Sequence, residues 1–98
     1  MTGTSRTSEG LEPRRRRALF RAWHRGTREM DLLLGRFADA YIATLSEADL
    51  ASFEALMEVP DRDLFAWVTG GEPVARNYQT PLYAALVGFH ASRPRTGT

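Results

Sequence analysis

Apolar residues recur three and four positions apart along most of the chain, and short polar stretches separate the apolar segments. This spacing is typical of amphipathic helices, whereas the alternating runs that would indicate strands are nearly absent. The longest apolar stripe follows Thr27, a suitable N-cap, and comprises Met30, Leu33, Leu34, Phe37, Tyr41 and Leu45. The pattern predicts an all-α fold with this second helix at the centre of the core.

Two helices flank this stripe. Pro13 suits a first helical position and Gly26 the residue just past a helix end, which predicts a first helix over residues 13–24. Ser46 resembles the start of a capping box and opens a third helix, which ends before Pro60. On the first helix, three residues share the face expected to turn inward: Leu19, Phe20 and Trp23.

Two shorter helices complete the prediction. Asp61 is expected to cap a fourth helix that ends at Gly70, and Thr80 to cap a fifth helix that begins at Pro81. Their side chains at core spacing are Leu64, Phe65, Trp67 and Val68, and then Leu82, Tyr83, Leu86, Val87 and His90. We therefore expect a compact five-helix bundle.

Length and composition fit a single domain. The chain has 98 residues, 43% hydrophobic and 26% charged, which suits one small core. Residues 1–12 are polar and aperiodic and predict a disordered N-terminal arm; the helical domain covers 13–91, and 92–98 form a flexible tail. No apolar run approaches the roughly 20 residues that span a bilayer, so we expect a cytoplasmic protein without membrane insertion.

The side chains offer little for catalysis or metal binding. There is no cysteine, and the only histidines, His24 and His90, fall in no triad, elbow or metal-ligand spacing. We therefore expect neither an enzyme nor a metal site.

Charge is unevenly distributed although the net charge is only +1. Residues 1–28 contain eight arginines and two glutamates, whereas residues 29–63 contain nine acidic residues and two arginines. The run Arg14 to Arg17 could bind nucleic acid or an acidic protein, as in a small regulatory adaptor. Charge patterning favours a solvated face or pairing within the chain, the acidic candidates being Glu47, Glu54 and Glu58.

The joint between the first two helices carries an unusual polar cluster. Gly26 permits a left-handed backbone and close approach by another surface, while Arg25 and Glu29 can form charge-assisted bonds outward or to each other. Leu32 lies off the apolar stripe of the second helix and is expected to be exposed. These residues suggest a docking surface, although a local cap with a salt bridge is an equal alternative.

Two segments resemble a known family. "RGTREMDLLLGRF", residues 25–37, resembles the R-G-x-x-E signature of the FAD assembly factor SdhE family, the bacterial relatives of the mitochondrial succinate dehydrogenase assembly factor. "FEALMEVPDRDLFAWVTGGEP", residues 53–73, resembles the family's F-x-x-L, D-x-D-L and W-x-x-G segment in the same order. The similarity covers about residues 15–89.

The resemblance implies a five-helix bundle that is not an enzyme in the ordinary sense. Family members bind the flavoprotein subunit of succinate dehydrogenase, or of fumarate reductase in some bacteria, and promote covalent attachment of FAD to one of its histidines. FAD then belongs to the partner, and no stably bound cofactor is expected in this chain, which we expect to be a monomer. The binding residues expected from the signature and from the joint between the helices are Arg25, Gly26, Glu29, Asp31 and Leu32.

This chain departs from the family pattern at three positions. His24 stands where members often have a second arginine, and Thr27 and Arg28 where the middle positions are often apolar. The adaptor remains the alternative function. It predicts that neutralising Arg14 to Arg17 abolishes function while Glu29→Ala spares it, the reverse of the assembly-factor prediction.

Overall fold

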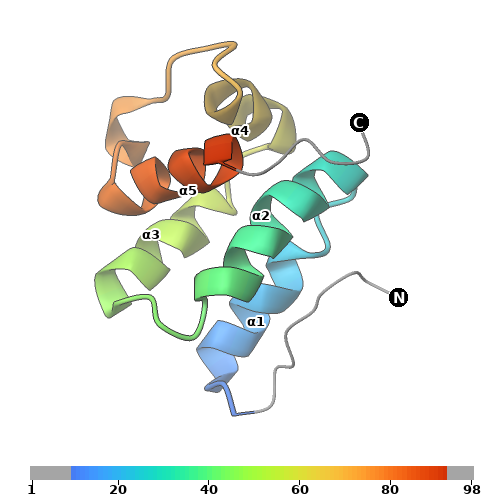
Figure 1. Cartoon of the computed structure of the whole chain (residues 1–98), viewed down its shortest axis with the longest axis vertical. Helices are drawn as coiled ribbons and strands as arrows, with labels where there is room; N and C mark the ends of the chain where they lie inside the picture. The colour runs from blue at the N-terminus through green and yellow to red at the C-terminus, as the bar shows by residue number, and fades with distance from the viewer. Residues whose placement is uncertain (1–9, 93–98) are drawn as a thin grey trace.

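The computed structural model describes residues 10–92, which contain five α-helices, one 3-10 turn and no strand (Figure 1). The helices are α1 Pro13–Ala22, α2 Arg28–Tyr41, α3 Glu47–Leu56, α4 Asp61–Val68 and α5 Pro81–Ser92, with the turn η1 Arg76–Tyr78 before the last. The all-α five-helix fold expected from the sequence is confirmed. Expectations about residues 1–9 and 93–98 lie outside the described residues.

The helices pack in two groups. α1 and α2 lie side by side, while α5 packs against α2, α3 and α4 (Figure 1). At the centre, the Phe37 ring of α2 lies 5.7 Å from both Phe53 of α3 and Phe89 of α5, measured between ring centroids. The second helix is therefore central to the core, as its apolar stripe predicted.

Side-chain caps begin three of the helices as expected. Thr27 Oγ1 accepts a hydrogen bond from the Met30 amide, Ser46 Oγ from Asp49, and Thr80 Oγ1 from Tyr83. The predicted cap of the fourth helix is wrong. Pro60 occupies the N-cap position without a side-chain hydrogen bond, and Asp61 is the first residue of α4.

The predicted arm boundary at residue 12 is also shifted. Leu11 is only 8% exposed and belongs to the core, and its carbonyl accepts a hydrogen bond from Arg16 Nη1. The ordered part therefore begins before Pro13. Within residues 10–92, no helix combines the length and the apolar character needed to cross a membrane.

Several side chains expected in the core lie at the surface instead. Phe20 is 62% exposed and Phe65 40% exposed, and Tyr41 and His90 are exposed too. The small residues Ala18 and Ala22 take the inward positions on α1, one helical turn apart, which leaves Phe20 on the opposite side. Tyr41 and His90 lie in the last turns of their helices, where the Tyr41 ring keeps an edge contact with Phe89 of α5, with ring centroids 5.7 Å apart.

Close packing of α1 on α2 depends on a glycine. The Trp23 indole is buried against Gly35, where an added Cβ would lie only 2.3 Å from the ring. The indole Nε1–H donates to Asp39 Oδ1 at 3.1 Å, so the polar end of the ring is satisfied as well. Trp23 is therefore a core residue as expected, whereas Trp67 is half-buried beside Tyr78.

Candidate docking site

The connection between α1 and α2, residues 23–27, contains Gly26 in a backbone conformation with positive φ. Its φ is +110°, and an added Cβ would meet nothing within 4 Å. Residues with a side chain rarely adopt this backbone conformation, so the glycine is required by the backbone and not by lack of space. The left-handed, exposed glycine expected from the sequence is confirmed.

Arg25 turns inward, although it precedes this exposed glycine. Its side chain is 11% exposed, and Nε and Nη2 donate to Asp61 Oδ1 at 3.0 and 2.7 Å. Nη1 donates to the Met57 carbonyl at 2.7 Å and Nη2 to the Val59 carbonyl at 3.2 Å. One guanidinium thus satisfies carbonyl groups just after α3 and a carboxylate at the start of α4.

Asp31 holds the same turn from the other side. Its Oδ1 accepts a hydrogen bond from the backbone N–H of Arg25 at 2.6 Å. The backbone and the side chain of Arg25 are therefore both fixed, the first by α2 and the second by the corner between α3 and α4. We call Arg25, Asp31 and Asp61 the Arg25 network.

Glu29 remains outside this network. It is exposed in the first turn of α2, where the helix dipole favours negative charge, and its carboxylate makes no hydrogen bond or ion pair with another described residue. The alternative of a local salt bridge between Arg25 and Glu29 is wrong, because Arg25 pairs with Asp61. Gly26, Thr27, Arg28 and Glu29 form a continuous exposed segment.

Leu32 does not match its prediction. It is half-buried and packs against the core, whereas the sequence predicted an exposed apolar side chain. The residue is one position, about 100° around the helix, from the buried Leu33. It therefore lies at the edge of the buried stripe and adds little apolar area to the surface.

The site also contains a residue that the sequence reasoning did not assign to it. Asp61 was expected only as a helix cap, yet it is the carboxylate partner of Arg25 from 36 positions away. The one available signal was its place at the start of the D-x-D-L segment. Neither local periodicity nor capping rules indicate which distant arginine such an aspartate pairs with.

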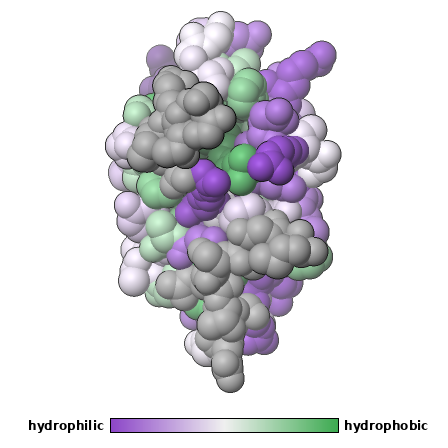
Figure 2. Space-filling model, turned by 45° about the vertical axis from the view of Figure 1, so that its right-hand side comes forward, coloured by the Kyte–Doolittle hydropathy of each residue, from purple (hydrophilic) through white to green (hydrophobic). Residues whose placement is uncertain are grey.

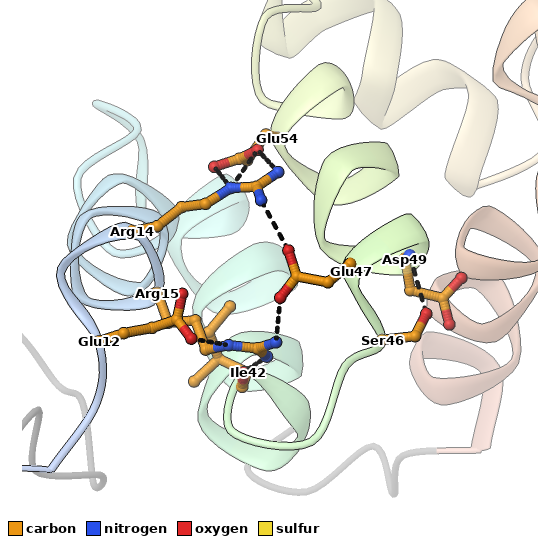
Figure 3. Close-up of polar contacts among 8 residues, drawn as sticks. All are labelled: Glu12, Arg14, Arg15, Ile42, Ser46, Glu47, Asp49 and Glu54. Atoms are coloured by element: carbon orange, nitrogen blue, oxygen red, sulfur yellow. Dashed lines mark hydrogen bonds and ion pairs between the residues drawn. The ribbon is translucent and has the colours of Figure 1, made fainter.

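The basic face of α1 is largely neutralised within the chain (Figure 3). Arg14 bonds to Glu54 at 2.7 Å and Glu47 at 3.0 Å, and Arg15 reaches the other oxygen of Glu47 at 3.4 Å. Arg21 pairs with Glu58. Pairing with all three predicted acidic residues is confirmed: Glu47 and Glu54 lie in α3, and Glu58 lies directly after it. This pairing leaves less free positive charge for nucleic acid than the sequence alone suggested.

The pair at the centre of this face is electrostatically coupled. The hydrogen bond from Arg14 lowers the pKa of the Glu54 carboxyl, and the same bond raises the pKa of Arg14. Both side chains are about one-third exposed, so water screens much of their attraction. The pair chiefly aligns α1 with α3. Within residues 10–92, no three His, Asp or Glu residues gather as a metal site would require.

Comparison with known proteins gives consistent matches. A family model described as "Flavinator of succinate dehydrogenase" matches residues 16–90. The FAD assembly factor SdhE of Acetobacter pasteurianus is 39% identical over 89 residues, which cover 91% of this chain and 80% of that protein. No solved structure matches the chain.

Mitochondrial proteins match as well. The proteins named succinate dehydrogenase assembly factor 2, mitochondrial, are 37% identical over 78 residues in Debaryomyces hansenii and 33% identical over 90 residues in Danio rerio. The matches cover 79% and 90% of this chain, but 51% and 57% of those proteins. The chain thus spans only about half the length of these mitochondrial relatives.

Proposed function

Since the chain belongs to the succinate dehydrogenase flavinator family, we propose that it binds the flavoprotein subunit of succinate dehydrogenase and promotes covalent attachment of FAD to that subunit. The fumarate reductase flavoprotein is a second candidate partner of the same kind. We further propose a cytoplasmic location, as expected from the sequence.

The observation that supports this site best is the division of the R-G-x-x-E segment into an inner and an outer part. Arg25 is bonded inside the protein, while Gly26 and Glu29 lie on the surface with open space at the glycine. The Arg25 network fixes the turn before any partner arrives. A fixed turn loses little conformational entropy on binding, which favours affinity.

The roles of the five expected site residues change accordingly. In this proposal Gly26 allows a close approach of the partner backbone, and Glu29 supplies the directional charged contact. Arg25 and Asp31 hold the turn in shape and do not touch the partner. Leu32 supports α2 from the edge of the core and contributes no separate contact.

No catalytic group is required of this chain. An assembly factor raises the yield of a covalent product if it stabilises the partner conformation in which the reacting groups are correctly placed. FAD and the reacting histidine both belong to the partner in this proposal. We therefore expect the chain to act as a monomeric binding protein, without enzymatic activity or a stably bound cofactor of its own.

The test is co-expression with the succinate dehydrogenase flavoprotein subunit of the same organism. Covalent flavin is read as fluorescence of the denatured flavoprotein band, with and without this protein. We expect the fluorescence to rise with the wild-type protein, and to fall to the level without it for Gly26→Arg and Glu29→Gln. Gly70→Arg is the matched control, because Gly70 also has a positive φ, +86°, and open space around it.

The control separates backbone strain from lost docking. Both arginine substitutions strain the backbone, but only Gly26→Arg places a side chain on the proposed surface. Equal fluorescence in every lane, with no co-purification, would disprove the assembly function. A rise that Gly26→Arg leaves intact would keep the function and remove the turn as its site.

A further inference from the structure

The outer side of α1 carries a ridge that leads towards the α1–α2 turn. The ridge consists of Arg17 and Phe20, three residues apart on α1, and His24, four residues further on and just past the end of the helix. This spacing places the three side chains on one side. Phe20 is 62% exposed, the largest exposed fraction among the large hydrophobic side chains of the described residues. His24 and Arg17 are exposed as well. The ridge is separate from the buried side formed by Leu19, Ala22 and Trp23.

The exposed ring is held in one position. Phe20 stacks on the His24 imidazole with ring centroids 3.8 Å apart and an interplanar angle of 19°. His24 Nδ1 lies 2.7 Å from the Phe20 carbonyl oxygen, and because a carbonyl only accepts, Nδ1 carries the proton and donates. A fixed aromatic ring loses little rotamer freedom on binding, which is a property of interface anchors.

The charge beside the ring is positive and lacks a close ion-pair partner. Arg14 and Arg21 pair with acidic side chains of α3 and the residues directly after it. Arg17 makes no hydrogen bond or close ion pair with any residue in the range 10–92, and Glu54 attracts it only through a longer-range coulombic interaction. Arg28, on the other side of the turn, also lacks such a partner among those residues. A surface complementary to the ridge would combine an apolar pocket with an acidic rim.

Among the described residues, the other exposed large hydrophobic side chains are less exposed than Phe20, with Tyr41 at 42% and Phe65 at 40%. In Figure 2, the hydrophobic residues that are visible form small areas bordered by hydrophilic residues. On such a surface a partner gains apolar contact mainly from single protruding side chains. Of the exposed large hydrophobic residues among those described, Phe20 lies nearest in sequence to the turn. Its stacking partner His24 is two positions before Gly26.

We propose that the ridge of Arg17, Phe20 and His24 extends the docking surface from the α1–α2 turn along α1. Phe20 is its apolar anchor, inserted into an acidic-rimmed pocket of the flavoprotein subunit. His24 holds the ring in place, and Arg17 attracts the acidic rim. The occupant follows from the proposed function. The continuity of the ridge with the turn, and the exposed Arg17 without a close ion-pair partner among residues 10–92, support the position.

The experiment measures affinity for the purified flavoprotein subunit by titration calorimetry. We expect Phe20→Ala to raise the Kd about tenfold or more, and Phe20→Trp to keep most of the affinity. Phe65→Ala is the matched control, because Phe65 is an exposed phenylalanine on α4, and its Kd should stay within about threefold of wild type. Arg17→Glu should weaken binding more at low salt than at high salt.

The outcomes separate the ridge from the function. If Phe20→Ala binds like wild type while Gly26→Arg does not, the ridge is not part of the surface and the proposed function stands. If the wild-type protein does not bind the subunit, both proposals fail. An equal loss in Phe65→Ala would remove the anchor role of Phe20. A wild-type dimer in sedimentation that Phe20→Ala dissociates, with unchanged subunit binding, would make the ridge a self-contact and overturn the proposal.

Discussion

Two glycines in the signature segment are required for different reasons. Gly26 has a backbone conformation that disfavours side chains, while the space around it is open. Gly35 lies within a helix, where any residue fits the backbone, but the Trp23 ring occupies the place of its Cβ. A substitution at Gly26 therefore strains a loop, whereas one at Gly35 pushes two helices apart.

We expect Gly35→Ala to destabilise the fold by about 1–3 kcal/mol, the usual effect of overpacking. For a domain of this size the Tm falls by roughly 4–8 °C per kcal/mol. Gly88→Ala is the control, since Gly88 lies in α5 with nothing within 4 Å of an added Cβ. This helical, open position should gain about 0.5–1 kcal/mol. Circular dichroism melts of both variants test the pair, and an unchanged Tm for Gly35→Ala would contradict the Trp23 packing.

At the scale of single residues, the sequence predicted backbone conformation and helix caps better than the exposure of side chains. The positive φ of Gly26 and the caps at Thr27 and Ser46 were foreseen, because they depend on neighbouring residues. The predicted exposure of Phe20 and of Leu32 was wrong. A periodic pattern gives the direction of each side chain around its own helix, but it does not show how much of that helix its neighbours cover. Exposure at the edge of an apolar face is decided by packing partners that lie far away in the sequence.

At the scale of elements, ion pairs orient α1 against α3 along most of its length. Arg14 and Arg21 reach acidic side chains of α3 and the residues directly after it. The coupling makes stability depend on pH at Glu54, whose pKa is lowered from its ordinary value of 4.5 by the hydrogen bond from Arg14. A carboxyl group whose pKa is lower in the folded state than in the unfolded state stabilises the folded state, fully so at pH values above its unfolded-state pKa.

This contribution should be complete above about pH 4.5 and lost as the pH falls through the lower folded-state pKa of Glu54. We expect Glu54→Gln to have a lower Tm than wild type at pH 7. Its Tm should also fall less than that of wild type as the pH is lowered from 7. Glu72→Gln is the control, because Glu72 is an exposed loop carboxylate without an ion pair among residues 10–92. Identical Tm-against-pH curves for wild type and Glu54→Gln would count against the coupling.

A second connection between elements is the bond from Arg25 to Asp61. We expect Arg25→Gln and Asp61→Asn each to lower the free energy of unfolding by about 1–3 kcal/mol, because each leaves a part-buried charge without its partner. The double variant should lose less than the sum, with a coupling of about 0.5–3 kcal/mol. Urea unfolding of the four proteins gives this cycle. Arg36→Gln, an exposed arginine without an ion pair among residues 10–92, should stay within about 0.5 kcal/mol of wild type.

The same variants distinguish positioning from contact. If Arg25 only holds the turn, then Asp61→Asn should reduce flavin attachment as much as Arg25→Gln does, although Asp61 was never part of the surface signature. If Arg25 touched the partner directly, Asp61→Asn would leave attachment close to wild type. Strictly additive unfolding energies would show that the bond between them does not form in solution.

At the scale of the whole molecule, the five helices and their order followed from periodicity and caps, because these are local signals. The radius of gyration of 12.8 Å agrees with about 13 Å for a compact globular chain of this length. The location of the candidate site was also available from the segment of residues 25–29. Its internal construction was not, because the pairing of Arg25 with Asp61 depends on how the α1–α2 turn meets the corner before α4.

The Arg25 network also bears on the order of events during synthesis of the chain on the ribosome. Asp31, which fixes the backbone of the turn, follows Gly26 within a few residues. The groups that fix the Arg25 side chain, namely the carboxylate of Asp61 and the carbonyl groups of Met57 and Val59, are made well after the turn itself. With 36 positions between Arg25 and Asp61, translation takes roughly 2–7 s to reach the second residue at about 5–20 residues per second. Through that interval the nascent turn lacks its bonds from the corner before α4. In the proposed function, the docking turn is therefore fully supported only once Asp61 has been translated, and a shorter nascent chain would present the turn without this support.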